Sequence, residues 1–230
     1  MSRGGDATHE RPVVDPAFAD FVMSRCRRDT ISRGRTIVER DTPCHDILIL
    51  ENGWAVREHH DPIGAIQTTA VYLPGDILNV SCLTEPVNRQ LVRALSECAV
   101  LSCRRTQFLE FMQGSRPAML AVMAFLTKEA ELLREALTAV GSQRGTHSMA
   151  TFLYQTRERL RLIGHVDEEE NRFRFPMTQE EVGHSLGLTN VHVSRVLRDL
   201  REDGVLSVKR GECQILDEDK FREMAFVVLR

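Results

Sequence analysis

A run of side chains between residues 190 and 198 has the types and spacing to contact DNA bases. If this stretch is helical, one face carries Asn190, Val191, Ser194, Arg195 and Arg198. An arginine can donate two parallel hydrogen bonds to a guanine, an asparagine can hydrogen-bond to an adenine, and a valine can contact a thymine methyl group. This face therefore has the chemistry to read base edges in the major groove.

Two simpler interpretations of these residues stay open. Arg195 could form a surface ion pair with Asp199 in the next helical turn, and His192 could be an ordinary exposed polar side chain. The formal net charge of the chain is −3, so attraction to phosphates would have to come from a local field rather than from the whole molecule.

Two short helices are predicted to position this face. Thr178 and Glu181 form a capping-box pattern at the start of the first helix. Gly187 is placed to end that helix with a positive φ, and Thr189 can cap the next one. The second helix turns an apolar face inward, formed by Val193, Val196, Leu197 and Leu200. Two helices joined by a glycine turn predict a helix-turn-helix.

A hairpin is predicted after the second helix, which Gly204 ends. Val205 to Val208 and Cys213 to Leu216 are its strands, and Lys209 and Arg210 lie at its tip. This hairpin would be the wing of a winged helix. Thr178 and Gln179, with the first N–H groups of their helix, suit a phosphate. The predicted DNA contacts are Thr178, Gln179, Thr189, Asn190, Val191, His192, Ser194, Arg195, Arg198, Lys209 and Arg210.

Residues 117 to 140 predict a long helix, since Pro117 suits a first helical turn and no glycine follows until Gly141. Apolar residues repeat at alternating spacings of three and four, which is typical of a helix that pairs with another. They are Met119, Met123, Leu126, Ala130, Leu133, Leu137 and Val140. We favour pairing with the same helix of a second copy over packing within one chain. Residues 141 to 145 would then act as a hinge.

The preceding part of the chain has short extended runs separated by turn signals. Apolar runs begin near residues 46, 54, 66, 91 and 99, and Asn52-Gly53 and Pro74-Gly75 stand between some of them. This pattern predicts an all-β barrel or roll.

The cysteines, the termini and the polar residues limit the function classes. None of the six cysteines forms a C-x-x-C pair, which argues against a zinc ribbon or a thioredoxin-like motif, and in a cytosolic chain we expect reduced, buried thiols. No apolar run reaches the ~18 residues of a membrane helix, and residues 1 to 16 lack the apolar core of a signal peptide, which favours a cytoplasmic protein without membrane contact. No catalytic triad, metal-spaced motif or phosphate loop is present. His59-His60 beside Asp61 is the nearest candidate, so we do not expect an enzyme.

From about residue 20 to 225 the chain resembles the cAMP receptor protein/Fnr (Crp/Fnr) family of transcription regulators. The segments that carry the resemblance are Leu73-Pro74-Gly75-Asp76, Val92-Arg93-Ala94, the long heptad helix, Thr178 to Gly183 and Val193 to Leu197. The resemblance implies a homodimer that binds a palindromic DNA site, contacts RNA polymerase, and senses an effector in a β-roll.

The resemblance is weakest at the effector site. Where the family's cyclic-nucleotide site has Gly-Glu, this chain has Asn79-Val80-Ser81, and it has Asn88-Arg89-Gln90 where Arg followed by Ser or Thr is expected. We therefore do not expect a cyclic nucleotide, and Gly75, Asp76 and Arg89 are only weak effector candidates. Cys26 is too far from Cys44 for the close cysteine spacing of the Fnr cluster. A haem, a redox-sensitive thiol or no effector stays open, so the cofactor is unknown. Val191 also departs from the family's usual acidic residue.

The expected fold is α+β, with an N-terminal cyclic-nucleotide-binding-like β-roll, a long dimerisation helix and a C-terminal winged helix-turn-helix. The expected domains are a flexible tail (1–16), a sensor β-roll (17–116), the dimerisation helix (117–142) and the DNA-binding domain (143–230). The alternative function is a ligand-sensing β-roll that acts through protein partners and carries a degenerate winged helix.

Overall fold

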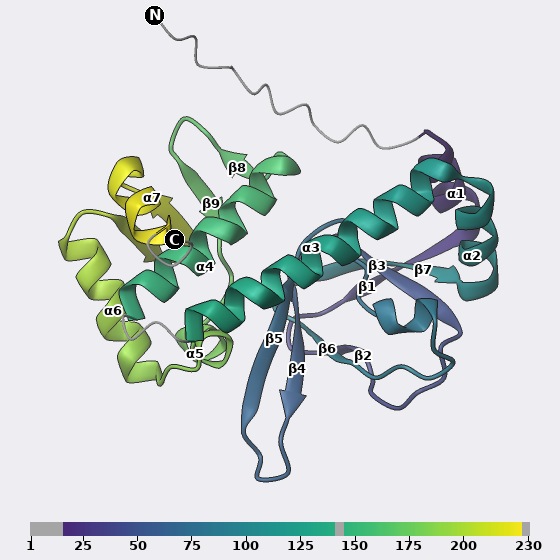
Figure 1. Ribbon diagram of the computed structural model, residues 1–230, viewed down its shortest axis with the longest axis horizontal. Coiled ribbons are helices and arrows are strands. Elements are labelled where there is room, and N and C mark those ends of the chain that lie inside the picture. The colour runs from purple at the N-terminus through teal and green to yellow at the C-terminus, as the bar shows by residue number, and fades with distance from the viewer. Residues whose placement is uncertain (1–15, 141–144, 227–230) are drawn as a thin grey trace, which may run out of the picture.

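The computed structural model describes residues 16–140 and 145–226. The N-terminal strands gather at one end of the molecule, the helix α3 crosses it diagonally, and the C-terminal helices form the other end (Figure 1). This arrangement confirms the predicted α+β fold, with a β-roll that precedes a long helix and a winged helix-turn-helix.

The first half consists mainly of strands. Its elements are α1 (Pro16–Arg25), β1 (Cys26–Ile31), β2 (Thr36–Val38), β3 (Asp46–Asn52), β4 (Ala55–His60), β5 (Ile66–Tyr72), the 3-10 turn η1 (Val80–Leu83), β6 (Leu91–Ala94) and β7 (Cys98–Arg104). The strands pair antiparallel in two sheets, of order β1-β7-β3 and β2-β6-β4-β5. Alternate residues of the strands, such as Leu50, Val92 and Ala94, are fully buried and form the core between the sheets.

The Asn52-Gly53 turn does not close a hairpin, although Asn-Gly often does. It passes the chain from β3 in one sheet to β4 in the other. Gly53 has a φ of 95°, and a Cβ atom there would lie 2.4 Å from the carbonyl oxygen of Glu97. The glycine is therefore required both by its backbone conformation and by the close approach of the next turn.

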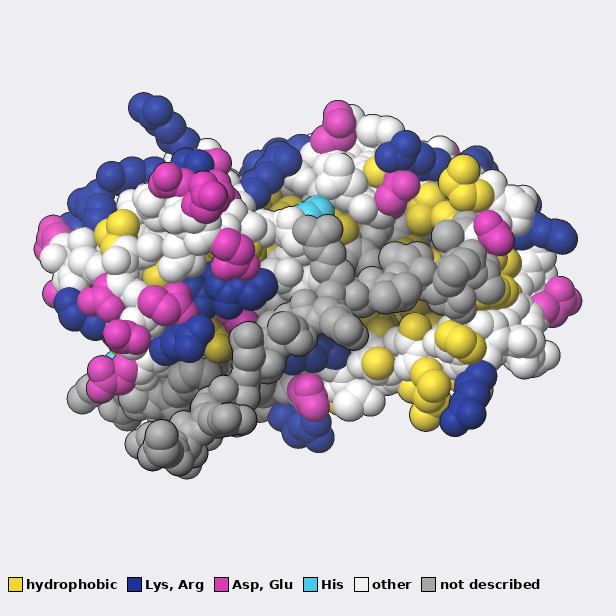
Figure 2. All heavy atoms as spheres, turned by 90° about the horizontal axis from the view of Figure 1, so that it is seen from above, with side chains coloured by type: hydrophobic (Ala, Val, Ile, Leu, Met, Phe, Trp, Pro, Cys, Tyr) yellow, Lys and Arg dark blue, Asp and Glu magenta, His cyan; other side chains and the backbone are white. Residues whose placement is uncertain are grey.

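Two helices join the β-roll to the C-terminal half. They are α2 (Arg105–Gly114) and α3 (Arg116–Val140). Ala118 and Val122 of α3 are buried, and Val122 packs in an apolar cluster with residues of the β-roll. The predicted pairing face is instead open: Met119, Met123, Leu126 and Leu133 are 42, 56, 42 and 44% exposed, and Ala130 is exposed. The side chains of Leu137 and Val140 lie outside the described residues. Hydrophobic side chains gather on the right-hand end of the face in Figure 2, where the view places α1, α2 and the first turns of α3.

The second half is a compact winged helix. Its elements are α4 (Gly145–Leu162), β8 (Val166–Asp167), β9 (Arg172–Arg174), α5 (Gln179–Leu186), α6 (Asn190–Glu202), β10 (Leu206–Lys209), β11 (Glu212–Ile215) and α7 (Glu218–Phe226). The strands form one sheet of order β10-β11-β9-β8. Leu153, Leu200 and Phe221 are buried in its core. The predicted hinge at residues 141 to 145 lies, apart from Gly145, outside the described residues.

The expectation of reduced cysteines is wrong for four of the six. The structure joins Cys26 to Cys103 and Cys44 to Cys82 by disulfides. The partners lie 77 and 38 residues apart in sequence, so spacing alone gave no signal of the pairing. Cys98 and Cys213 are free and buried, as expected for small apolar side chains. No helix in the described part of the chain has the length and hydropathy that a membrane crossing requires.

Candidate nucleic-acid interface

The helix-turn-helix begins with the predicted capping box. The Glu181 backbone N–H donates to Thr178 Oγ1 over 3.2 Å, and the Thr178 N–H donates to Glu181 Oε2 over 2.7 Å. Gly187 ends α5 in the left-handed conformation, with a φ of 66°. A glycine is also required at position 183, which the sequence pattern did not predict. A Cβ atom at Gly183 would lie 2.5 Å from the carbonyl oxygen of Leu188. Its lack of a side chain lets the turn fold back on α5.

The second helix, α6, turns its two faces as predicted. The Thr189 side chain caps it by accepting a hydrogen bond from the His192 N–H over 3.3 Å. Val193 and Leu200 are fully buried and Val196 nearly so. Leu197 is half-buried against the same core. On the other face Val191 is 72% exposed. Burying an apolar row on one side of α6 therefore fixes which side chains face solvent.

All the predicted DNA contacts lie at the surface. The exposed residues are Thr178, Gln179, Thr189, Asn190, Val191, His192, Ser194, Arg195, Arg198, Lys209 and Arg210. They belong to the N-terminus of α5, the outer face of α6 and the turn between β10 and β11. Basic side chains are interspersed with acidic ones over the C-terminal half, on the left of Figure 2, so no single-sign patch covers the visible face.

The predicted alternative for Arg195 is not formed. Asp199 contacts Arg198 over 3.6 Å, and Arg198 also contacts Glu202 over 3.9 Å. Among the residues that the structure describes, Arg195 forms no ion pair. Its guanidinium is thus exposed on the outer face of α6 and is not engaged by a carboxylate.

The wing is a tight hairpin. Lys209 of β10 pairs with Glu212 of β11. Arg210 and Gly211 between them have φ angles of 52° and 79°, as in a type I′ turn, whose twist matches that of paired strands. Lys209 and Arg210 are consequently held at an exposed tip.

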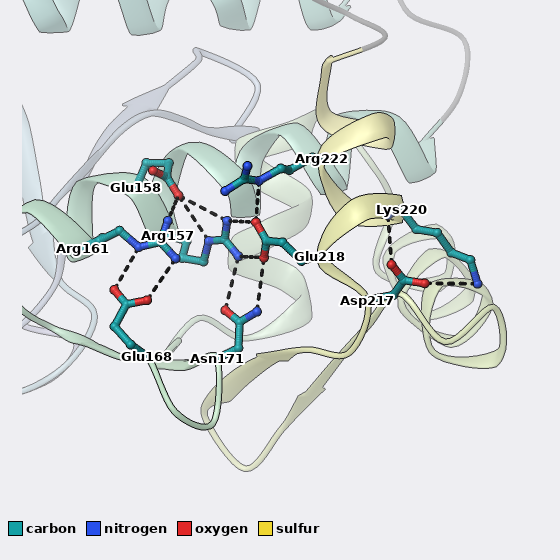
Figure 3. Close-up of polar contacts among 9 residues, drawn as sticks. All are labelled: Arg157, Glu158, Arg161, Glu168, Asn171, Asp217, Glu218, Lys220 and Arg222. Atoms are coloured by element: carbon teal, nitrogen blue, oxygen red, sulfur yellow. Dashed lines mark hydrogen bonds and ion pairs between the residues drawn. The ribbon is translucent and has the colours of Figure 1, made fainter. Parts of the chain in front are cut away.

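A buried arginine ties the winged helix together, and we did not predict it (Figure 3). The side chain of Arg157, on α4, is 0% exposed. Its Nη1 and Nη2 donate to the two carboxylate oxygens of Glu218 on α7 over 2.5 and 2.8 Å. Nη1 also donates to Asn171 Oδ1 over 3.3 Å, and the guanidinium lies 5.1 Å from the centroid of the Phe221 ring. The sequence signal for a buried arginine was the position of Arg157 between two apolar residues of the same helix, Leu153 and Leu160, which are both buried.

One further carboxylate contacts this arginine, and a second arginine contacts Glu218. Glu158 accepts from Arg157 and from Arg161, and Arg222 donates to Glu218 over 2.6 Å. The hydrogen bond from Arg157 lowers the pKa of Glu218 from 4.5 to about 2, despite the opposing effect of burial. The network holds α4, α7 and the turn before β9 in one arrangement, and α4 in turn packs against α6.

The β-roll also holds the helix-turn-helix. Arg93 of β6 donates to Glu181 Oε1 over 3.2 Å and to Glu58 over 2.7 Å, and Arg33 donates to Glu181 Oε2 over 3.4 Å. Glu181 therefore serves both the capping box and the contact between the two halves. The Trp54 and Phe175 rings meet edge to face nearby, with centroids 5.9 Å apart.

A second polar contact between the halves involves a predicted effector residue. Arg159 of α4 contacts Asp76 and donates to the carbonyl oxygen of Val71 over 2.8 Å. Asp76 also accepts from the Leu73 N–H over 2.7 Å, and burial raises its pKa. Gly75, with a φ of 98°, forms the turn beside it. The structure thus places Asp76 at the contact between halves.

The segments that replace the family's cyclic-nucleotide motif are occupied by internal hydrogen bonds. The Asn79 amide accepts from the Leu48 N–H and donates to the Asp46 carbonyl, each over 2.9 Å. The Asn88 amide donates to the carbonyl oxygens of Glu39 and Gln90. Arg89 is exposed and pairs with Asp41 over 3.3 Å, so the structure does not bring it together with Gly75 and Asp76. Within the described ranges, no group of three or more His, Cys, Asp or Glu residues is placed to hold a metal ion.

Two family models match the chain. Residues 28–115 match the cyclic nucleotide-binding domain, and residues 148–224 match the Crp-like helix-turn-helix domain. The first match covers the β-roll, and the second covers most of α4 through α7.

Curated relatives and solved structures extend over nearly the whole chain. The transcriptional regulatory protein btr of Bordetella pertussis is 25% identical over 211 residues, which cover 90% of this chain and 85% of btr. The fumarate and nitrate reduction regulatory protein of Vibrio cholerae is 24% identical, covering 87% and 79%. The structure of FixK2 from Bradyrhizobium japonicum superposes with a TM-score of 0.75 at 19% identity, covering 86% of this chain and 96% of FixK2. A CooA mutant from Carboxydothermus hydrogenoformans superposes with a TM-score of 0.70 at 18% identity, covering 89% of each chain.

Proposed function

The chain belongs to the Crp/Fnr family of transcription regulators, and from that premise we propose that it binds a palindromic DNA operator as a homodimer in the bacterial cytoplasm. On the operator it contacts RNA polymerase. We propose no catalytic reaction for it, in keeping with relatives that are transcription regulators.

The outer face of α6 is the observation that carries this proposal. Arg195 is exposed there and is not neutralised by Asp199, which contacts Arg198 instead. Ser194 and Asn190 lie exposed beside it. In a helix-turn-helix, the N-terminal face of the second helix enters the major groove. Arg195 is the residue that we assign to a guanine, and Val191 suits a thymine methyl group.

The open face of α3 supports the homodimer. Leu126 and Leu133 stay more than 40% exposed in the single chain, although their heptad spacing is that of a paired helix. A second α3 related by a twofold axis would cover both faces at once. Two DNA-binding domains related by the same axis would then contact two symmetric half-sites, which explains why the proposed operator is palindromic.

The proposed effector is not a cyclic nucleotide. The side-chain amides of Asn79 and Asn88 form hydrogen bonds with backbone groups of the β-roll. Neither offers the carboxylate that the family's site uses for the ribose or the cation that it uses for the phosphate. The β-roll matches the family's cyclic nucleotide-binding domain without these groups in the two segments.

The alternative is a β-roll that acts through protein partners, and the net charge of −3 is the observation that favours it.

Selection of bound sequences from a random DNA pool separates the two functions. The full-length protein is compared at one stated salt concentration with Arg195→Ala and with Arg201→Ala. Arg201 is a matched control because it is exposed on the same helix but lies nearer its C-terminus, past Arg198, the last predicted contact on α6.

We expect the wild-type protein and Arg201→Ala to enrich the same palindrome. Arg195→Ala should weaken operator binding by about 1–3 kcal/mol per half-site and relax the preference at one base pair. Equal enrichment by all three proteins would contradict the role of Arg195. No enrichment by any of them, in either the oxidised or the reduced form, would favour the alternative function.

A further inference from the structure

Four cysteines lie in one apolar cluster of the β-roll. Cys44, Cys82 and Cys103 are buried there, and Cys26 packs against them. The inference below rests on the proposed function, because a DNA-binding regulator works in a reducing compartment. Disulfides in that compartment are usually transient and catalytic or redox-sensing rather than structural.

The two disulfides have different surroundings. Cys26 and Cys103 are directly opposite one another in the ladder between β1 and β7, which continues to the pair of Ile31 and Cys98. The hydrogen bonds of that ladder hold the two strands whether or not the sulfurs are joined. Cys44 and Cys82 lie in segments that form no strand pair with each other. Opening the Cys44–Cys82 bond therefore removes the covalent link between two segments that are otherwise joined by single hydrogen bonds, such as that from the Cys44 N–H to the Pro86 carbonyl oxygen over 2.9 Å.

The Cys44–Cys82 link is connected to the start of α2. Nε of Arg105, the first residue of α2, donates to the Cys82 carbonyl oxygen over 2.6 Å. The Arg105 N–H donates to the carbonyl oxygen of His45, the residue after Cys44, over 3.0 Å. Arg105 thus contacts the backbone on both sides of the disulfide.

From α2 the contact reaches α3. Only Ser115 separates the two helices, and Ser115 hydrogen-bonds to the Ala118 N–H in the first turn of α3. Val122 and Phe125 of α3 pack in the same apolar cluster as the two cysteines. The position in which α3 sits on the β-roll therefore depends on how this cluster is held.

A small reactant can approach Cys82. Cys82 lines a cavity of about 540 Å³, together with Asn79 and Asn88. The two free cysteines are poor candidates for the same chemistry. Cys98 and Cys213 are fully buried and do not line this cavity, so it gives a small reactant no approach to either of them.

We propose that Cys44 and Cys82 form a reversible oxidation site for hydrogen peroxide, and that their disulfide fixes the position of α3 on the β-roll. The Cys82 thiolate attacks one oxygen of hydrogen peroxide, the O–O bond breaks, and the leaving hydroxide takes up the proton that the thiol released, so that a sulfenic acid and one water result. The Cys44 thiolate attacks that sulfur, the S–S bond forms, and the sulfenic oxygen leaves as a second water. Two thiols thus lose two electrons and two protons, and hydrogen peroxide is reduced to two waters. A dithiol reverses the step by exchange and becomes a disulfide itself.

The oxidised form is the one that we expect to pair and to bind DNA more tightly. A fixed α3 loses less conformational freedom when it meets a second copy, and such preorganisation strengthens association. Reduction should weaken both dimerisation and operator binding, by about 5- to 150-fold, the usual range of coupling between two sites.

The test uses full-length protein prepared with dithiothreitol or with hydrogen peroxide, and the disulfides are counted by alkylation and mass spectrometry. The dimer dissociation constant is measured by sedimentation, and operator affinity by titration of the selected DNA. The Cys44→Ser/Cys82→Ser variant should lose the response to peroxide. The matched control Cys26→Ser/Cys103→Ser should keep it.

The outcomes separate this proposal from the proposed function. If the wild-type dimer constant and operator affinity are the same in both redox forms, the switch is refuted while the DNA-binding function stands. If no operator is selected, the DNA-binding function fails, and the dimer constant of the wild-type protein in its two forms alone decides the switch. A full response in Cys44→Ser/Cys82→Ser would also overturn the assignment. The wild-type comparison needs no variant, so a variant that misfolds leaves the test intact.

Discussion

At the scale of single residues, Arg157 shows how a charge can be placed inside a domain. Its guanidinium has no exposed surface, and the Glu218 carboxylate meets it through two hydrogen bonds. Removing Glu218 leaves Arg157 with the Glu158 carboxylate, and Glu218 itself is 32% exposed, so we expect the cost of a lost hydrogen bond to a charged group, about 1–3 kcal/mol, rather than that of a fully buried unpaired charge. We expect Glu218→Gln to lower the free energy of unfolding by an amount in this range, as measured by urea denaturation of the full-length protein.

Glu168 offers a matched control for that measurement. It also pairs with an arginine, Arg161, over 2.9 Å, but its side chain is 58% exposed. Exposed ion pairs contribute about 0–1 kcal/mol. Equal losses for Glu168→Gln and Glu218→Gln would show that the buried network does not carry the stability of the winged helix.

The same network predicts how stability depends on pH. The pKa of Glu218 is about 2 in the folded protein, below its usual 4.5. A group with a depressed folded pKa stabilises the fold fully above its unfolded pKa and loses that contribution as the pH falls toward the folded value. The unfolding free energy should therefore decline between about pH 4.5 and pH 2, and less steeply in Glu218→Gln. Parallel pH profiles for the two proteins would contradict the assignment.

Residue-scale predictions succeeded where the interaction is local. The capping box of Thr178 and Glu181 spans one helical turn, so a three-residue spacing identifies it. The second role of Glu181 was not predictable in this way. Its partners Arg33 and Arg93 come from a different half of the chain, and only the packed structure brings them together.

At the scale of elements, the contact of α5 with the β-roll is the one most open to test. Arg93 joins Glu58 of β4 to Glu181 of α5 and is only partly exposed. We expect Arg93→Ala to loosen α5, so that its backbone amides exchange with solvent about tenfold faster, which corresponds to about 1.4 kcal/mol. Hydrogen exchange with mass spectrometry measures this directly.

Arg89→Ala is the control for this contact. Arg89 lies in the same part of the β-roll, but its partner Asp41 is as exposed as Arg89 itself. Its removal should leave the exchange of α5 unchanged. If both variants speed the exchange of α5 equally, the effect is a general loosening of the β-roll and the specific contact through Arg93 is refuted.

Elements with strong local patterns were predicted well, and their long-range connections were not. The long helix and both helices of the helix-turn-helix follow from apolar spacing, capping residues and glycines. The turn at Asn52-Gly53 was recognised, but its sequence does not say that the two flanking strands enter different sheets. The disulfides were missed for the same reason, because they join segments that only the folded β-roll brings side by side.

At the scale of the whole molecule, the two halves share an apolar cluster. It contains Trp54 and Leu73 of the β-roll together with Phe175 and Val182 of the winged helix. A displacement in the β-roll can therefore reach α5 through packed apolar side chains. The fold thus joins the β-roll to the winged helix through this apolar cluster and through the polar contacts of Glu181 and Asp76.

The open face of α3 yields the last prediction, which concerns the assembly. Leu126 is 42% exposed in the single chain, and Ala124 is exposed on the same helix. The two positions differ by about 200° around the helix axis, so only Leu126 belongs to the heptad face. We expect Leu126→Asp to raise the dimer dissociation constant at least about 100-fold, because the twofold axis introduces the buried charge twice. Ala124→Asp adds the same charge to the same helix and should leave dimerisation unchanged in sedimentation.

On DNA, Leu126→Asp should bind the full palindrome no more tightly than a single half-site, because affinity for the pair depends on the linked second domain. A dimer that survives Leu126→Asp but not Ala124→Asp would place the subunit contact on a different face of α3.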